Sequence, residues 1–200
     1  MPLILASGSA ARAQMLRQAG LDFVVETAPV DEAEIKFSLK AEGVAVERVA
    51  EALAEAKAGR VAGRYAGQSG IAVIGADQML EVEGEWLDKP HDLDAARGQL
   101  QLLRGKSHRL VSSVVLMLAN ERIWHHTASA YLRMRPFSDT FLDHYLAATA
   151  ADVLKSVGCY QLEGRGLQLF DRIDGDFFTI LGLPLLPLLG QLRQIGVIEE

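Results

Sequence analysis

Short apolar runs alternate along the chain with segments whose apolar residues are spaced as on one face of a helix. Residues 3–6 (Leu-Ile-Leu-Ala) and 71–76 (Ile-Ala-Val-Ile-Gly-Ala) are uninterrupted apolar runs, which predict buried strands. Residues 10–19 and 46–63 instead carry apolar side chains every three or four positions, which predicts amphipathic helices. Strands and helices that alternate in this way are typical of an α/β fold.

The middle of the chain is patterned for antiparallel strands. Residues 79–82 and 85–87 flank a Glu-Gly pair, which predicts a hairpin with its turn at Gly84. Two longer apolar-rich segments, 109–119 and 123–136, are separated by a polar turn and predict two long strands. We therefore expect a mixed sheet, with parallel and antiparallel strands.

The remaining elements are indicated mainly by their ends. Asp92 and Ser138 are favourable N-cap residues and predict the starts of two further helices. Pro184 predicts the start of a C-terminal helix, since proline is favoured in a first helical turn. Shorter strands are expected at residues 167–173 and 177–181.

The composition fits one globular domain and excludes several classes of partner. The chain has 200 residues, 50% of them hydrophobic, which is enough for one full core, so residues 1–200 are expected to form a single domain. Its 20 Lys and Arg against 26 Asp and Glu give a net charge of −6 and no general attraction to nucleic acid or to an anionic membrane. The single cysteine, Cys159, excludes an internal disulfide and indicates a reducing compartment, and the sequence shows no leader, so a cytoplasmic protein is expected.

A small polar loop follows the first predicted strand. Ser7-Gly8-Ser9 separates this strand from the first helix, and a helix N-terminus offers unpaired N–H groups to anions. The hydroxyls of Ser7 and Ser9 can donate to phosphate oxygens, and Arg12 in the first turn adds positive charge. The loop is therefore a candidate phosphate site, although the same residues also suit a simple turn and helix cap.

Two acidic positions are candidates for a cation site. Asp77 follows the second apolar run, where ligands collect in open α/β sheets, although an aspartate capping a loop is the alternative. Glu32 lies in an expected loop after the first helix, where acidic residues are usually solvated. The two carboxylates together suit Mg²⁺, which needs only one or two when substrate phosphates and water supply its other ligands.

Two lysines are candidates for binding a phosphate chain. Lys89 precedes Pro90, which restricts Lys89 to extended geometry and so presents it from a fixed backbone. Lys57 lies on the predicted helix of residues 46–63. Either lysine is a suitable point charge for phosphate, and either is equally compatible with an ordinary solvated surface.

These segments together resemble the Maf family of nucleoside triphosphate pyrophosphatases over nearly the whole chain. The resemblance rests on ordered motifs: Leu-Ile-Leu-Ala-Ser-Gly-Ser at the start, Val-Asp-Glu at 30–32, Leu-Ala-Glu-Ala-Lys-Ala at 53–58, Ile-Gly-Ala-Asp at 74–77, Asp-Lys-Pro at 88–90, Gly-Cys-Tyr-Gln-Leu-Glu-Gly at 158–164 and Leu-Gly-Leu-Pro-Leu at 181–185. One departure is the Ala10-Ala11 pair, where family members usually have proline followed by arginine or a large residue. That departure bears on substrate specificity more than on chemistry.

The resemblance implies a fold, a reaction and a set of roles. The fold would be an elongated, twisted mixed β-sheet flanked by helices, with two lobes around a central cleft, in a homodimer. The reaction would be the hydrolysis of a nucleoside triphosphate to the monophosphate and pyrophosphate with a divalent cation, Mg²⁺ or Mn²⁺. The predicted catalytic residues are Asp77, Lys89 and Glu32, the metal ligands are Asp77 and Glu32, and the substrate-binding residues are Ser7, Ser9, Arg12, Lys57, Gln78 and Glu163.

Gln78 and Glu163 bear on which base is bound. They resemble the family branch that acts on 7-methyl-GTP, whereas the branch for dTTP and UTP carries threonine and glutamine at these positions. N7-methylated guanine is a cation, and a carboxylate favours a cationic ring over a neutral one. We therefore expect a modified nucleotide such as 7-methyl-GTP, in a house-cleaning role, with dTTP or UTP as the alternative.

Two functions of other classes stay open on the sequence. One is a nucleotidyl or nucleotide-sugar transferase centred on Asp174 and Asp176, although a tight turn between two strands explains those residues equally simply. The other is a non-catalytic nucleotide-binding regulator of cell division. Pyrophosphate release across a nucleotide panel distinguishes all three.

Overall fold

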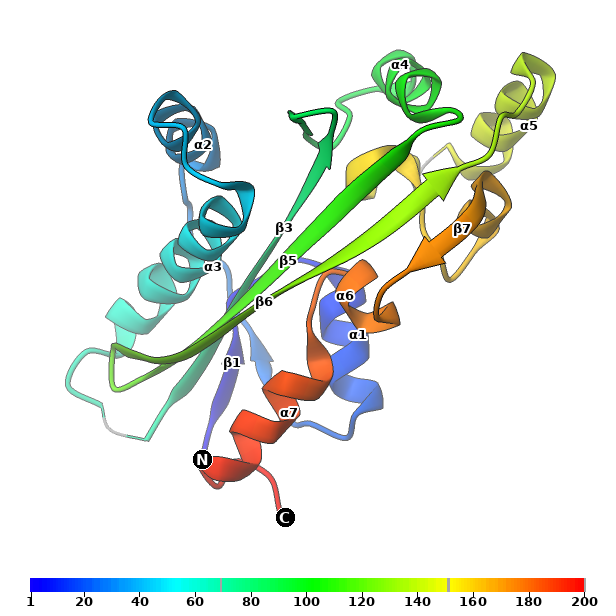
Figure 1. The fold of residues 1–200 in the computed structure, drawn as a ribbon. Coiled ribbons are helices and arrows are strands. Elements are labelled where there is room, and N and C mark those ends of the chain that lie inside the picture. Colours follow the sequence, from blue (N-terminus) through cyan, green and yellow to red (C-terminus); the bar gives the residue numbers. More distant parts are fainter. Residues whose placement is uncertain (69, 151, 200) are drawn as a thin grey trace. The chain divides into compact units, whose positions relative to one another are not determined.

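The computed structural model describes residues 1–68, 70–150 and 152–199 and has an α/β architecture (Figure 1). The strands are β1 (Leu3–Leu5), β2 (Val24–Val25), β3 (Ala72–Val82), β4 (Glu85–Leu87), β5 (Ser107–Leu118), β6 (Glu121–Met134) and β7 (Phe170–Asp174). The α-helices are α1 (Ala10–Gln18), α2 (Glu32–Ala41), α3 (Val46–Ala62), α4 (Leu93–Leu103), α5 (Asp139–Thr149), α6 (Phe177–Ile180) and α7 (Leu185–Gln194). Short 3₁₀ turns complete the described part of the chain, at η1 (Gly63–Tyr65), η2 (Val153–Lys155), η3 (Val157–Cys159) and η4 (Arg165–Leu169).

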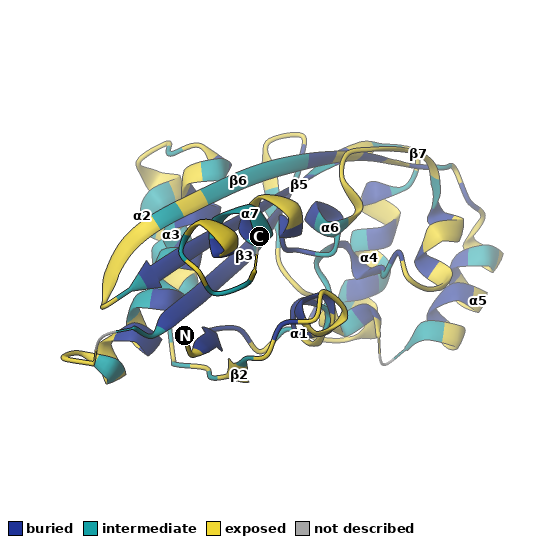
Figure 2. Ribbon diagram, turned by 90° about the horizontal axis from the view of Figure 1, so that it is seen from below, coloured by how far each residue is buried: buried dark blue, intermediate teal, exposed yellow. Residues whose placement is uncertain are grey.

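The described strands form one seven-stranded mixed sheet. Its order is β2-β1-β3-β5-β6-β7, and β4 pairs with β3. Strand β1 runs parallel to both β2 and β3, whereas the pairs β3–β4 and β6–β7 are antiparallel. Strand β3 is buried along nearly its whole length, while the first residues of β6 are exposed (Figure 2). The prediction of an α/β fold with a mixed sheet is confirmed.

The chain divides into two compact units. The first unit comprises Met1–Gln78, Val111–Ala128 and Gly182–Glu200, and the second comprises Met79–Leu110 and Ser129–Leu181. The expectation of a single domain with two lobes around a cleft stays a prediction. In the described residues, no helix has both the length and the apolar character needed to span a membrane.

In the first unit, α3 packs unusually closely against β3. A Cβ atom on Gly75 would lie only 2.1 Å from the carbonyl oxygen of Ala54 and 2.7 Å from the Cβ of Ala58. Only glycine fits there, because real Cβ atoms do not approach other heavy atoms so closely. The small side chains on α3 allow this approach, and it brings Lys57 from the helix toward Asp77 on the strand.

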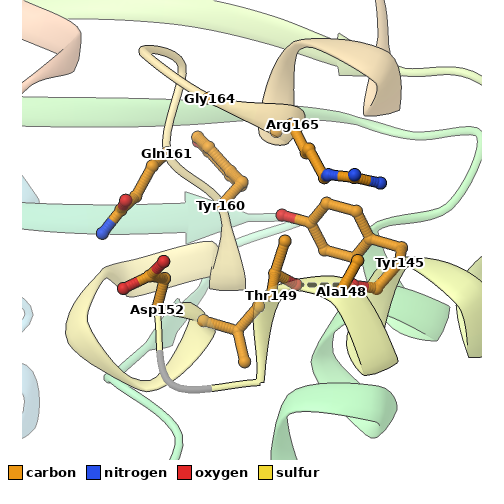
Figure 3. A pocket seen from close by; sticks show the side chains of 10 residues that line it. Tyr145, Ala148, Thr149, Asp152, Tyr160, Gln161, Gly164 and Arg165 are labelled. Carbon is orange, nitrogen blue, oxygen red and sulfur yellow. Dashed lines mark hydrogen bonds between the residues drawn. The ribbon is translucent and has the colours of Figure 1, made fainter.

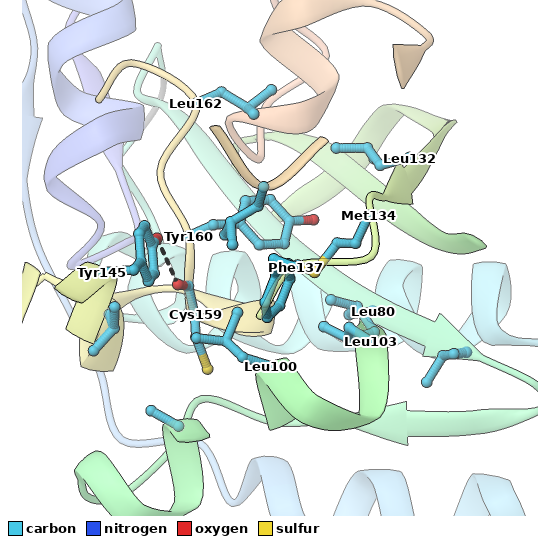
Figure 4. Close-up of a cluster of buried hydrophobic side chains, with 14 of the residues drawn as sticks. Leu80, Leu100, Leu103, Leu132, Met134, Phe137, Tyr145, Cys159, Tyr160 and Leu162 are labelled. Carbon is cyan, nitrogen blue, oxygen red and sulfur yellow. Dashed lines mark hydrogen bonds between the residues drawn. The ribbon is translucent and has the colours of Figure 1, made fainter. Parts of the chain in front are cut away.

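The core of the second unit is partly aromatic (Figure 4). It is formed by α4, α5, β5, β6 and the segment around Tyr160, and its central residues include Leu80, Leu100, Leu103, Leu132, Met134, Phe137, Tyr145, Cys159, Tyr160 and Leu162. Cys159 is fully buried and packs as a small core side chain. Burial raises the pKa of its thiol to about 12, so the sulfur stays protonated and unreactive.

Most of the predicted elements are present. The confirmed ones are β1, α1, α3, the β3–β4 hairpin, α4, β5, β6, α5 and α7. The predicted caps are also in place. Asp92 accepts a hydrogen bond from the backbone N–H of Ala95 at 2.7 Å, and Ser138 accepts one from Phe141 at 3.1 Å.

Two predictions about the candidate acidic residues are corrected. Glu32 does not lie in a loop but is the first residue of α2, because Asp31 caps that helix by accepting from the backbone N–H of Glu34 at 3.0 Å. Asp77 does not end its strand, because β3 continues to Val82 and pairs there with β4. Asp77 nevertheless follows the part of β3 that pairs with β1, which ends at Ile74.

The strand predicted at residues 177–181 is wrong, since this segment forms the short helix α6. The carboxylate of Asp176 accepts from both the backbone N–H of Thr179, at 2.7 Å, and its hydroxyl, at 2.8 Å. This cap satisfies a donor that would otherwise be unpaired and favours the helix over the strand. The turn predicted at 174–176 is present, between β7 and this helix.

Candidate functional site

The loop between β1 and α1 is held by its two serines. Ser9 is the N-cap of α1, and its hydroxyl oxygen accepts from the backbone N–H of Arg12 at 3.4 Å. The hydroxyl oxygen of Ser7 accepts twice, from the backbone N–H of Ser9 at 3.3 Å and from Arg12 Nη1 at 3.0 Å. A hydroxyl that accepts in this way keeps its own hydrogen for a further partner. Both serines can therefore still donate to an anion.

Arg12 is buried, and its side chain holds several segments of the first unit together. Its Nη1 also donates to the carbonyl oxygen of Ala76 at 2.7 Å, and its Nε donates to that of Gly182 at 2.8 Å. The side chain thus joins the β1–α1 loop to β3 and to the segment before α7. Within the described residues, Nη2 forms no hydrogen bond and is the part of Arg12 available to a ligand. Burial lowers the pKa of Arg12, and the charges of Asp77 and Glu32 oppose that shift.

Asp77, Lys57 and Glu32 come together in the first unit. The Nζ of Lys57 lies 2.6 Å from Oδ1 of Asp77 and 2.9 Å from Oε1 of Glu32. The side chain of Asp77 is only 7% exposed, whereas that of Glu32 is 43% exposed and open to solvent. A single lysine therefore joins a buried carboxylate to an accessible one.

The second carboxylate oxygen of Asp77 is unusual. Oδ2 is buried and has no hydrogen-bond partner among the described residues. Burial raises the pKa of Asp77, while the positive charges of Lys57 and Arg12 pull it down in part. A carboxylate that is more basic than usual and has one unsatisfied oxygen is suited to accept a proton or to bind a cation.

The carboxylates of Asp77 and Glu32 fit a divalent cation in part. No group of three or more histidine, cysteine, aspartate or glutamate side chains in residues 1–68, 70–150 and 152–199 is placed to hold a metal. Two carboxylates are enough for Mg²⁺ or Mn²⁺ only if a phosphate chain and water complete the ligand set. The unsatisfied Oδ2 of Asp77 is the observation that supports such a site.

Gln78 follows Asp77 on β3, and a hydrogen bond fixes its side chain. Its side-chain Nε2 donates to the hydroxyl of Ser112 at 3.0 Å, and Ser112 is fully buried on β5. Gly182 lies beside both side chains: a Cβ there would touch Gln78 at 3.6 Å and Arg12 at 3.4 Å, and its φ of 97° favours glycine. Sequence reasoning missed Ser112 and Gly182. The signal for Ser112 was a hydroxyl within an apolar strand, since a buried hydroxyl needs a partner.

Lys89 and Glu163 belong to the second unit. Lys89 is exposed in the segment between β4 and α4, and Glu163 is exposed in the turn between η3 and η4. The residues brought together in the first unit are Ser7, Ser9, Arg12, Glu32, Lys57, Asp77 and Gln78. The roles of Lys89 and Glu163 stay predictions.

The second unit also contains a pocket of about 200 Å³ (Figure 3). It is lined by Tyr145, Ala148, Thr149, Asp152, Val153, Tyr160, Gln161, Gly164, Arg165 and Gly166. None of these described lining residues is a predicted site residue. The alternative centre at Asp174 and Asp176 gains no support, because the carboxylate of Asp176 already caps α6.

Comparison with known proteins gives one consistent result. The model for the family described as Maf-like protein matches residues 2–195. A nucleoside triphosphate pyrophosphatase from Paramagnetospirillum magneticum is 55% identical over 193 residues, which cover 96% of this chain and 98% of that protein. One from Granulibacter bethesdensis is 53% identical, with 97% of each chain covered. A 7-methyl-GTP pyrophosphatase from Rhizobium meliloti is 47% identical, with 98% of each covered.

Proposed function

Because this chain belongs to the family of Maf-like proteins and hydrolyses nucleoside triphosphates to monophosphates and pyrophosphate, we propose that Asp77 is its catalytic base. The observation that carries the proposal is the buried Asp77 carboxylate: Oδ1 accepts from Lys57, and Oδ2 has no hydrogen-bond partner in residues 1–68, 70–150 and 152–199. A raised pKa makes this carboxylate a better proton acceptor than an exposed aspartate.

The proposed reaction is the attack of water on the α-phosphorus. A bond forms between the water oxygen and phosphorus, one proton of the water passes to the carboxylate of Asp77, and the bond from the α-phosphorus to the bridging oxygen breaks, with its electron pair leaving on pyrophosphate. Lys57 and Lys89 stabilise the negative charge that develops on the leaving pyrophosphate. Lys57 is already beside Asp77, so it both orients the base and neutralises the site.

Ser7, Ser9 and Arg12 form the proposed phosphate cradle. The two hydroxyl hydrogens and Nη2 of Arg12 are the donors left over after the internal hydrogen bonds of the loop. The other donors of Arg12 join the β1–α1 loop to β3 and to Gly182. Replacement of Arg12 is therefore expected to affect both phosphate binding and the geometry of that loop.

Glu32 and Asp77 are the proposed ligands of a divalent cation, Mg²⁺ or Mn²⁺. Such an ion, when bound, withdraws charge from phosphate oxygens and favours attack at phosphorus. The test measures pyrophosphate release by wild-type protein and Glu32→Gln with Mg²⁺, Mn²⁺ or excess EDTA. Full activity of the wild type in excess EDTA would contradict the proposed cation, but it would leave the proposed role of Asp77 as the base unchanged.

The proposed substrate is a modified purine triphosphate such as 7-methyl-GTP. The name of the Rhizobium meliloti relative, with Gln78 and Glu163 in this chain, supports that choice. A carboxylate at 163 attracts the positively charged methylated ring and accepts from the N–H groups of guanine. UTP and dTTP are the competing substrates, and a preference for either by the wild-type protein would overturn the choice.

We further propose that the protein is a cytoplasmic homodimer. Cys159 is a free, buried thiol, which supports a reducing compartment. Light scattering coupled to size-exclusion chromatography measures the oligomeric state, and a mass of about 21.7 kDa would contradict the dimer.

A further inference from the structure

One amide in the second unit joins the segments that carry Lys89 and Glu163. The side-chain Nε2 of Gln99, on α4, donates to the backbone carbonyl oxygen of Asp88 at 2.8 Å. The Oε1 of the same amide accepts from the thiol of Cys159, with sulfur and oxygen 3.3 Å apart. Asp88 directly precedes Lys89, and Cys159 precedes Glu163 in one loop. Gln99 therefore contacts both segments at once.

Cys159 has a conformation that needs support from its surroundings. Its φ of 63° lies in the left-handed region, which residues other than glycine rarely adopt. Its backbone N–H donates to the carbonyl oxygen of Ser156 at 3.3 Å, and its own carbonyl oxygen accepts from the hydroxyl of Tyr145 at 3.0 Å (Figure 4). These contacts fix the direction in which the thiol points. Because the thiol stays protonated, it remains a donor to Gln99.

The rest of this loop, residues 156–166, is equally well held. The hydroxyl of Ser156 donates to the carbonyl oxygen of Tyr160 at 2.7 Å, and the hydroxyl of Tyr160 lies 2.7 Å from Nε2 of His108. Gly166 packs so tightly that a Cβ there would lie 2.4 Å from the carbonyl oxygen of Gln161. Because the segment between Cys159 and Glu163 is tightly held, we expect a displacement at Cys159 to shift Glu163 as well.

We propose that Gln99 is a positioning residue that sets the spacing between Lys89 and the Glu163 loop. The inference rests on the proposed function, in which Lys89 contacts phosphate and Glu163 reads the base. A glutamine amide suits the task because it presents one acceptor and one donor on the same planar group, toward the thiol and the carbonyl. Glutamate would lack the donor for Asp88, and leucine would lack both groups.

The test compares Gln99→Leu with Gln101→Leu, which makes the same chemical change at an exposed position of α4. KM and kcat of pyrophosphate release are measured for 7-methyl-GTP, GTP, UTP and dTTP. Loss of two hydrogen bonds that orient ligand contacts is expected to raise KM about three- to tenfold, with a smaller change in kcat and a flatter ranking of bases. Gln101→Leu should match the wild type. Equal behaviour of the two variants would overturn the proposal.

A second pair of variants tests the same link from the loop side. Cys159→Ala removes the donor to Gln99 and is expected to reproduce the rise in KM, whereas Cys159→Ser keeps a donor and is expected to retain most of the wild-type affinity. This pair also decides the question if Gln99→Leu fails to fold. Identical kinetics of Cys159→Ala and Cys159→Ser would contradict the proposal.

Double-mutant cycles separate this inference from the proposed function. Gln99→Leu is combined with Lys89→Ala and with Glu163→Gln, and both combinations are expected to be less than additive. Additive effects in both cycles would overturn the role of Gln99 alone. Lys89→Ala and Glu163→Gln without any effect of their own would instead overturn the proposed roles of those two residues.

Discussion

Among the described residues, each unit contains one buried side-chain atom without a hydrogen-bond partner, and the two atoms have opposite surroundings. In the first unit, Oδ2 of Asp77 belongs to a carboxylate that lies beside Lys57 and near Arg12. In the second unit, Nδ1 of His108 belongs to a ring packed against Tyr160 and Phe170. Burial favours the neutral form of both groups. It raises the pKa of Asp77 and lowers the pKa of His108 to about 4.

The difference lies in what could satisfy each atom. Asp77 lies among the charges of Lys57, Arg12 and Glu32, which a phosphate chain and a cation would complete, so its unsatisfied oxygen indicates chemistry. His108 packs against aromatic rings, and its Nε2 is hydrogen-bonded to the hydroxyl of Tyr160. Its unsatisfied Nδ1 therefore indicates a cost in folding free energy and no chemistry. An unpaired buried atom is therefore informative about function only together with its neighbours.

The largest effect is expected from Asp77→Asn. This change removes the base while it keeps the side-chain shape, and pyrophosphate release should fall by about two orders of magnitude or more. Since the pKa of Asp77 is raised, its ionised form costs the folded state free energy at neutral pH. Asp77→Asn should therefore be no less stable than the wild type at pH 7 in thermal unfolding. A folded variant with near-normal turnover would exclude Asp77 as the base.

The next effect concerns stability in the second unit. The pKa of His108 is about 4 in the folded protein against 6.5 when exposed, so the unfolded chain binds the proton more tightly between these values. The free energy of unfolding should then fall as the pH drops from 6.5 to 4, by up to about 3 kcal/mol from this residue. His108→Gln should flatten that decline in urea titrations at several pH values. An unchanged pH dependence would assign the decline to other groups.

A smaller effect is expected from Lys57→Met. Loss of the positive charge raises the pKa of Asp77 further, so the base becomes deprotonated only at higher pH. The acidic limb of the pH profile of kcat/KM should move to higher pH, and the activity should fall about tenfold at neutral pH, about 1.4 kcal/mol in barrier. Arg60→Met, an exposed position on the same helix, is the matched control. An unshifted acidic limb would mean that Lys57 does not act on Asp77.

The smallest effect tests the alternative centre in the second unit. Asp176→Ala removes the cap of α6 and should lower the free energy of unfolding by about 1 kcal/mol. Pyrophosphate release should be unaffected, because the cap is not part of the proposed chemistry. A loss of activity as large as that of Asp77→Asn would restore the transferase hypothesis.

Local patterns were sufficient for much of the fold and for the members of the first-unit cluster. The run at residues 3–6, the helix rhythm around Lys57 and the caps at Asp92 and Ser138 are all signals carried by neighbouring residues. Helix α2 was not predicted, because its apolar residues Ile35, Phe37 and Leu39 alternate with polar ones, which is the period of a strand, and none of its residues is fully buried. Two phenylalanines in α6 favoured a strand, and the cap from Asp176 reversed that preference.

The contacts of Arg12 and Gln78 could not be predicted in the same way. Arg12 reaches Ala76 and Gly182, and Gln78 reaches Ser112, all far away in the sequence. Such contacts depend on which strands become neighbours in the folded sheet. The sequence can therefore name the groups that do the chemistry, but their hydrogen bonds come only from the folded chain.

The most direct test of the account compares chemistry with selectivity in one assay. It measures kcat/KM of pyrophosphate release for 7-methyl-GTP, GTP, UTP and dTTP with the wild type, Asp77→Asn and Glu163→Gln. Asp77→Asn should lower all four values by a similar large factor, because the base acts on a phosphorus common to every substrate. Glu163→Gln should instead change their order and weaken the preference for 7-methyl-GTP. A Glu163→Gln variant with an unchanged ranking, or an Asp77→Asn variant impaired on only one base, would contradict the account.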